Sequence, residues 1–250
     1  MAFVASDSVR IHFDVEGDGA PLVLQHGTSS DGQAWRDQGY VAALKDRYRC
    51  IIIDARGHGL SDKPHEPLAY YLGLRVGDIL AVLDSLGVKR AHYFGYSMGG
   101  WIGLGAAKYA PSRFTSFVIG ASHPYERSMA PLREGFAKGV EAWVADGERM
   151  SGEKLSPEAR ARALSNDMTA LIALTRDRMD MSEVLSTMTK PTLFLAGTAD
   201  PIFDEVERAS RQAPGARFVA LPGLDHRAGF RRSDLVLPHL RKFLDSVKVA

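Results

Sequence analysis

The sequence predicts an α/β protein with a mostly parallel central sheet, helices on both faces of the sheet and a small helical cap inserted between two strands. Short β-like runs alternate with helix-like segments along most of the 250 residues, which is typical of a parallel sheet whose strands are connected by helices. Most of these runs are continuously apolar, as expected for strands buried on both faces. The expected strands are residues 9–15, 21–25, 49–54, 91–95, 114–120, 192–196 and 217–220.

Two local signals organise the first part of the chain. Residues 16–19, EGDG, follow the first predicted strand, and a glycine-rich turn of this kind favours a hairpin into the second strand. Between Tyr70 and Gly87 the apolar residues recur at helical spacing, and Gly87 is well placed as a C-terminal cap. These residues predict a helix that leads directly into the strand at 91–95.

The alternation of strands and helices is interrupted between residues 122 and 190. Two helix-like segments with polar and apolar faces lie here, MAPLREGFAKGVEAWVADGERM and SPEARARALSNDMTALIALTRDRM. Ser156 followed by Pro157 has the pattern of a helix start. We therefore expect residues 122–190 to form a helical cap, inserted into a core domain made of residues 1–121 and 191–250.

The composition is typical of a soluble globular protein, with 45% hydrophobic residues, 24% charged residues and a net charge of +1. This balance leaves no basic surplus for binding nucleic acid or an anionic membrane surface. The first ten residues lack the pattern of a secretory signal, and no apolar run is long enough to span a bilayer. The single cysteine, Cys50, is expected to be a buried strand residue, and this cysteine usage fits a cytoplasmic location.

Common sequence motifs for metal and cofactor binding are missing. The chain has no His-Glu-x-x-His zinc helix and no Gly-x-x-x-x-Gly-Lys phosphate loop. It also has no complete Gly-x-Gly-x-x-Gly dinucleotide fingerprint after a strand. We therefore expect neither a metal nor a cofactor.

One serine lies between two glycines in FGYSMGG, residues 94–100, directly after an apolar run and before a helix-like one. At a sharp turn from strand to helix, small residues such as Gly95 and Gly99 are needed two positions to either side of Ser97, because larger side chains would collide. The N–H of Met98, at the start of the helix, can stabilise a developing negative charge. The Gly-x-Ser-x-Gly pattern alone is common, and its place between strand and helix makes Ser97 a candidate nucleophile.

A serine nucleophile requires a base to take its proton and an acid to orient that base. The run LFLAGTADP places Asp200 in the loop after one strand, and FVALPGLDH places His226 in the loop after the next. Because the C-terminal ends of neighbouring parallel strands share one edge of a sheet, both side chains can converge on Ser97. In LVLQHGTSS, Gly27 allows a backbone turn that leaves the Thr28 N–H as a second oxyanion donor.

Together these motifs resemble those of α/β-hydrolase-fold enzymes. The matching pieces are the pair His26-Gly27, the run DARGHGLSD at residues 54–62, the turn around Ser97, Asp200 and His226. They follow the family's chain order of Ser, then Asp, then His. The resemblance covers nearly the whole chain apart from the cap.

The resemblance implies a cofactor-free hydrolase in which Ser97 attacks a carbonyl, His226 transfers the proton and Asp200 orients His226. It also implies that the backbone N–H groups of Thr28 and Met98 hold the oxyanion. Family members that act as dehalogenases or epoxide hydrolases use an aspartate nucleophile. The serine at position 97 therefore favours acyl chemistry.

Other carboxylates compete with Asp200 for the role of the acid. Asp204 lies one helical turn beyond Asp200, and Asp225 is adjacent to His226 in the sequence. Some family members carry the acid after the sixth strand, where this chain has Glu126.

The cap and the neighbouring loops are expected to line the substrate pocket. The candidate pocket residues are Trp35, Phe136, Trp143, Met168 and Leu171. Aromatic and methionine side chains on amphipathic helices are equally compatible with a hydrophobic core. Of the other histidines, His58 is expected to be structural, and His123 is expected to have no role in the chemistry.

The predicted reaction is hydrolysis of a small carboxylic ester through a Ser97 acyl-enzyme, and a lactone or enol-lactone is equally compatible as the substrate. Two alternatives stay open. One is carbon–carbon bond hydrolysis or peracid formation with the same triad, and the other is a small-molecule receptor on a hydrolase scaffold. The expected partner is a small ester or lactone, with neither nucleic acid nor a membrane, and the sequence makes no prediction of oligomeric state.

Overall fold

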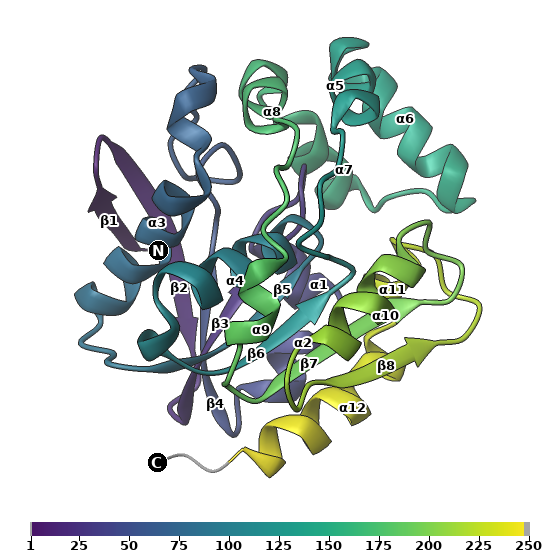
Figure 1. Ribbon diagram of the computed structural model, residues 1–250. Coiled ribbons are helices and arrows are strands. Elements are labelled where there is room, and N and C mark those ends of the chain that lie inside the picture. The colour runs from purple at the N-terminus through teal and green to yellow at the C-terminus, as the bar shows by residue number, and fades with distance from the viewer. Residues whose placement is uncertain (1, 248–250) are drawn as a thin grey trace.

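The computed structural model describes residues 2–247, which fold around an eight-stranded sheet (Figure 1). The strands are β1 (Ala2–Ser6), β2 (Val9–Glu16), β3 (Ala20–Gln25), β4 (Tyr48–Ile53), β5 (Ala91–Tyr96), β6 (Phe114–Gly120), β7 (Thr192–Gly197) and β8 (Arg217–Leu221). Their order across the sheet is β1-β2-β4-β3-β5-β6-β7-β8. β2 pairs antiparallel with both β1 and β4, and all other pairs are parallel. The predicted mostly parallel sheet is confirmed.

The predicted strands coincide with β2 to β8 to within one residue at either end. The sequence did not reveal β1, the edge strand of the sheet. Most of its side chains are exposed or half-buried, and Phe3 is 48% exposed. An edge strand of this kind lacks the continuous apolar run that identifies a central strand.

The predicted hairpin between β2 and β3 is wrong, because β4 lies between these two strands. β2 pairs antiparallel with β4, and β3 pairs in parallel with the opposite edge of β4. A Cβ at Gly17 would overlap the Lys45 carbonyl, and a Cβ at Gly19 would overlap the Arg47 carbonyl. The glycines of this turn therefore permit close approach to the loop before β4, and they do not specify which strand becomes the neighbour of β2.

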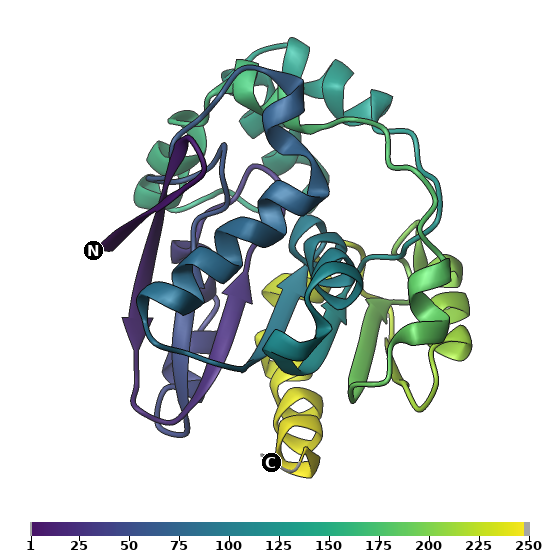
Figure 2. The same cartoon turned by 60° about the vertical axis from the view of Figure 1, so that its left-hand side comes forward.

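Helices cover both faces of the sheet (Figure 2). They are α1 (Gln33–Asp37), α2 (Tyr40–Leu44), α3 (Leu72–Ser85), α4 (Met98–Tyr109), α5 (Ala130–Ala137), α6 (Val140–Ser151), α7 (Pro157–Leu164), α8 (Met168–Leu174), α9 (Glu183–Thr187), α10 (Phe203–Gln212), α11 (Ala228–Arg231) and α12 (Ser233–Ser246), with 3-10 turns η1 (Pro67–Tyr70) and η2 (Pro111–Arg113). Val23 of β3 packs in the buried cluster that includes α3, α4 and α10. Its neighbours Leu22 and Leu24 pack in the cluster that includes α2 and α12. This alternation explains why the central strands are apolar on both faces.

Local predictions for individual helices and residues are also confirmed. Helix α3 occupies the predicted segment, and Gly87 follows it with a φ of +65°, a conformation that favours glycine. The Ser156 side chain accepts a hydrogen bond from the Ala159 N–H and caps α7. Cys50 is fully buried in β4.

The segment between β6 and β7 contains helices α5 to α9. Helices α5 to α8 lie above the edge of the sheet at which the parallel strands end (Figures 1 and 2). The last helix, α9, packs against α4 and α10 beside the sheet. Within residues 2–247, no helix combines the length and apolar character needed to span a membrane.

Candidate active site

Ser97 lies on the sharp turn between β5 and α4. Its backbone φ is +56°, a conformation that residues other than glycine rarely adopt. A Cβ at Gly95 would overlap the Gly99 carbonyl, and a Cβ at Gly99 would overlap the Gln25 carbonyl at the end of β3. The two glycines therefore allow α4 to cross closely over the ends of β5 and β3, which lifts the Ser97 side chain off the edge of the sheet.

Three side chains predicted from separate loops meet at this edge of the sheet. Nε2 of His226 is 2.8 Å from Oγ of Ser97. Nδ1 of His226 is 2.7 Å from Oδ2 of Asp200. Because an ionised carboxylate can only accept, the Nδ1–H donates to Asp200 and the Ser97 hydroxyl donates to Nε2. In this geometry Nε2 of His226 can accept the Ser97 hydroxyl proton, which is what a serine nucleophile requires.

The competing carboxylates are held elsewhere. Asp225 accepts hydrogen bonds from the backbone N–H groups of Arg227 and Ala228. Asp204 and Glu126 are exposed to solvent. Only Asp200, of the carboxylates considered from the sequence, forms a hydrogen bond with His226 within the described residues.

Two backbone N–H groups lie free beside Ser97. A Cβ built on Gly27 would be 3.4 Å from the Ser97 Cβ, so the loop after β3 passes directly beside the serine. Thr28 is the next residue of this loop, and Met98 is the first residue of α4. Within residues 2–247, the N–H groups of Thr28 and Met98 donate to no protein acceptor. Both could therefore donate to a negatively charged oxygen beside Ser97.

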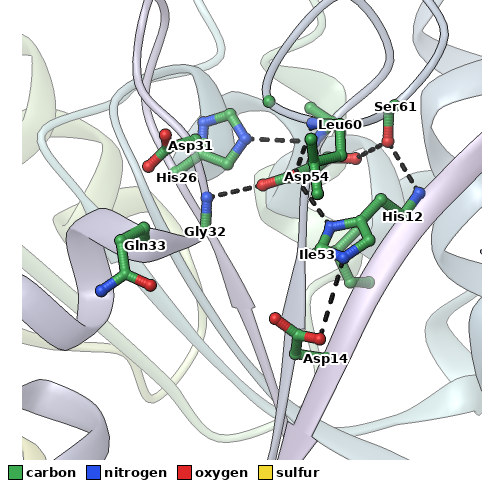
Figure 3. Close-up of polar contacts among 12 residues, drawn as sticks. His12, Asp14, His26, Asp31, Gly32, Gln33, Ile53, Asp54, Leu60 and Ser61 are labelled. Carbon is green, nitrogen blue, oxygen red and sulfur yellow. Dashed lines mark hydrogen bonds and ion pairs between the residues drawn. The ribbon is translucent and has the colours of Figure 1, made fainter. Parts of the chain in front are cut away.

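A buried hydrogen-bond network around Asp54 holds the loop after β3 in place (Figure 3). The Asp54 carboxylate accepts from the Gly32 N–H at 2.7 Å, the Leu60 N–H at 2.9 Å and Nδ1 of His12 at 2.9 Å. The Ser61 hydroxyl donates to the Asp54 carbonyl and accepts from the His12 N–H. The run DARGHGLSD forms the loop after β4, and its hydrogen bonds hold the loop that carries Thr28.

Two buried histidines complete this support. Nε2 of His26 accepts from the Ala55 N–H at 3.1 Å, and Nε2 of His58 accepts from the Ser29 N–H at 3.1 Å. Burial and the proximity of His26 lower the pKa of His58 well below its ordinary value, which keeps Nε2 of His58 free to accept. His58 therefore has the expected structural role: it binds the backbone at Ser29, next to Thr28.

A cavity of about 480 Å³ opens at Ser97 and His226 and extends beneath helices α6 and α7, within the range typical of small-molecule sites. Trp143 of α6 lines it and donates from Nε1 to the Ser29 hydroxyl at 3.2 Å. The cavity wall also includes Met129, Leu132, Arg127 and Arg178. No sequence signal identifies these four residues, because they lie at or between helix ends, where periodicity does not indicate direction.

The other predicted pocket residues lie outside this cavity wall. Trp35 is fully buried against Tyr40, Phe94 and Phe230 below the site. Phe136 is 1% exposed and packs behind Trp143, with ring centroids 4.5 Å apart. Met168 and Leu171 pack into the main hydrophobic cluster. Trp35, Phe136 and Leu171 are buried in the core, and Met168 is half-buried against it.

Comparison with known proteins identifies the family. Residues 20–168, more than half of the chain, match the alpha/beta hydrolase fold family. The chain belongs to this family. Its match covers the turn around Ser97 and the loop that carries Thr28, so the expected resemblance is confirmed for the family and the fold.

This α/β hydrolase is similar to hydrolases along almost its whole length. It is 31% identical over 200 residues to the 3-oxoadipate enol-lactonase 1 of Acinetobacter baylyi, and the aligned region covers 72% of this chain and 71% of that protein. The crystal structure of a hydrolase from Pseudomonas aeruginosa has a TM-score of 0.86 at 26% identity and covers 97% of both chains. The esterase RhEst1 of Rhodococcus has a TM-score of 0.83 at 25% identity and covers 98% of both chains.

Proposed function

We propose that the chain is a carboxylic ester hydrolase that works through an acyl-enzyme at Ser97. The observation that carries the proposal is the continuous hydrogen-bond chain from Asp200 through His226 to the Ser97 hydroxyl, with distances of 2.7 and 2.8 Å. Similarity to an enol-lactonase and to an esterase supports both lactones and open esters as substrates.

Acylation begins when Ser97 Oγ attacks the carbonyl carbon while Nε2 of His226 takes the hydroxyl proton. The N–H groups of Thr28 and Met98 stabilise the negative charge that develops on the carbonyl oxygen. Asp200 keeps the imidazole in the reacting tautomer and stabilises the imidazolium that forms. The bond to the leaving oxygen then breaks, that oxygen takes the proton from His226, and Ser97 carries the acyl group as an ester.

Deacylation repeats these steps with water as the nucleophile. His226 takes a proton from the water as its oxygen attacks the acyl carbon, and the same proton passes to Ser97 Oγ when the acid leaves. With a lactone, the acid and the leaving oxygen belong to one molecule, so a single product is released. In this proposal residues 122–190 act as a cap over a core of residues 1–121 and 191–250, because the wall of the cavity above Ser97 includes Trp143 and Leu155.

Replacement of Ser97 tests the proposal. Because the triad acts as a unit, we expect Ser97→Ala to lower kcat on 4-nitrophenyl acetate by about a million-fold. The matched control is Ser186→Ala on the exposed side of α9, where the hydroxyl donates to the Glu183 carbonyl, and its kcat should stay within about two-fold of the unsubstituted enzyme. Turnover by Ser97→Ala at a rate close to that of the control would refute the acyl-enzyme.

A further inference from the structure

Two arginines lie side by side where the chain enters and leaves the cap. Arg127 precedes α5, and Arg178 follows α8. The N–H of Arg127 donates to the Arg178 carbonyl at 3.0 Å, and the N–H of Arg178 donates to the Arg127 carbonyl at 2.9 Å. Both residues line the cavity that contains Ser97. The backbone bridge therefore holds the two arginines opposite each other at the wall of the proposed active site.

Neither guanidinium group has an anionic partner within residues 2–247. No ion pair or side-chain hydrogen bond involves Arg127 or Arg178 there, and the Arg178 Cζ instead lies 4.9 Å from the centre of the Trp101 ring. The acidic residues of the cavity wall are engaged elsewhere: Asp31 and Asp37 with Arg162, Glu148 with Lys154, and Asp200 with His226. Asp177, next to Arg178 in the sequence, pairs with Arg133.

This environment is unfavourable for a buried cation. Arg178 is only 7% exposed. Its burial, together with the nearby charges of Arg127 and Arg75, lowers its pKa to about 9. A buried charge without a partner is costly, and a contact with an aromatic ring offsets only part of that cost. An anion that entered the cavity would gain from two cations that are already in place and unpaired.

Arg178 also connects the cavity to the predicted oxyanion donors. A second cavity of about 220 Å³ is lined by Thr28, Met98 and Trp101. Arg178 and Thr28 line both cavities. An anion bound by Arg178 would therefore share these walls with a carbonyl group held at Thr28 and Met98.

We propose that Arg178 and Arg127 bind a carboxylate that the ester or lactone substrate carries in addition to its reacting carbonyl. A guanidinium group matches a planar carboxylate through two parallel N–H donors, which a lysine cannot provide. The inference rests on the proposed function, because it names the substrate class of the same site. The preferred substrates are then half-esters of dicarboxylic acids, or esters or lactones of carboxylated alcohols.

Two matched pairs of substrates test the inference without any substitution. The mono-4-nitrophenyl ester of adipic acid and 4-nitrophenyl hexanoate differ only in a terminal carboxylate or methyl group on the acyl side. The acetate ester of 4-hydroxybutanoate and butyl acetate differ in the same way on the alcohol side. We expect kcat/KM to be about ten-fold or more higher for the carboxylate in at least one pair. Equal or lower values for the carboxylate in both pairs would overturn the inference.

Substitution of the arginines locates the preference. In Arg178→Gln and in Arg127→Gln, we expect the ratio of kcat/KM between the carboxylate and its neutral partner to fall about ten-fold. The control, Arg149→Gln, removes one positive charge from α6 at a side chain that is 72% exposed, and its ratio should stay within about two-fold. An unchanged ratio in both cavity variants would overturn the inference. Should Arg178→Gln fail to fold, Arg127→Gln and the substrate pairs still decide.

Binding separates failure of this inference from failure of the proposed function. Calorimetry on Ser97→Ala, with monomethyl adipate and methyl hexanoate as probes, requires no turnover. We expect the half-ester to bind about ten-fold more tightly, and Arg178→Gln in the same background to remove that difference. Equal affinities would overturn the carboxylate site even if esters are hydrolysed. Absence of hydrolysis for every ester, with preferential binding intact, would instead count against the proposed function alone.

Discussion

The Asp200 carboxylate has only 1% of its side-chain surface exposed to solvent, whereas the His226 ring is 34% exposed. Asp200 accepts from His226 with one oxygen and from the Ile202 N–H with the other at 3.1 Å. The second hydrogen bond fixes the orientation of the carboxylate. In the proposed mechanism Asp200 sets both the position and the tautomer of the imidazole, while the ring also lines the cavity at Ser97.

Loss of the Asp200 charge should lower activity severely without unfolding the protein. Asn at this position can donate to Nδ1 and select the wrong imidazole tautomer, so we expect Asp200→Asn to lower kcat on 4-nitrophenyl acetate by about ten-thousand-fold. Asp204→Asn, which changes the exposed carboxylate one helical turn away, should leave kcat within about two-fold. Comparable losses in the two variants would show that the acid has been misassigned.

Gly95 is one of the residues of the turn around Ser97 at which a side chain would overlap the backbone. A methyl group there would overlap the Gly99 carbonyl, so Gly95→Ala should lower the free energy of unfolding by about 1–3 kcal/mol and should also lower kcat. Gly77→Ala in α3 is the matched control, because a Cβ at Gly77 meets nothing within 4 Å. We expect the free energy of unfolding of that variant, measured by urea titration, to rise by roughly 0.5–1 kcal/mol. Equal changes in the two variants would contradict the close crossing.

At the scale of elements, the loop after β4 supports the loop after β3, which carries Thr28. Asp54 and His58 each accept a backbone hydrogen bond from that loop, from Gly32 and Ser29 respectively. His58 can accept only when it is neutral, and burial keeps it so by lowering its pKa. The position of the predicted oxyanion donor thus depends on two loops that are far apart in the sequence.

The titration of His58 should be visible in stability. The unfolded chain protonates His58 below a pH of about 6.5 while the folded chain keeps it neutral, so the free energy of unfolding falls as the pH decreases. His58→Gln removes this contribution but costs packing at every pH. The difference in free energy of unfolding between the unsubstituted protein and His58→Gln, measured by urea titration, should therefore be largest at pH 8 and shrink towards pH 5. A difference that stays constant over that range would contradict the account.

At the scale of the whole molecule, the sequence predicts the central strands and the residues that follow them, because burial and parallel topology determine both. Central strands such as β4 and β7 are identified because both of their faces are covered by helices, and Ser97, Asp200 and His226 follow because parallel strands end at one edge. The neighbour of β2 is not predictable from the turn at 16–19, because strand order depends on long-range contacts. The directions of Trp35 and Arg178 depend on how helices and linkers pack above the sheet, which local periodicity does not encode.

The proposed mechanism depends most directly on a covalent bond at Ser97. The decisive measurement is peptide mass spectrometry after incubation with a serine-directed alkyl fluorophosphonate. We predict one adduct, on the peptide that contains Ser97, with loss of esterase activity in proportion to labelling and no adduct in Ser97→Ala. An unlabelled Ser97 in protein that has lost its activity, or an adduct that persists in Ser97→Ala, would contradict the assignment of Ser97 as the nucleophile.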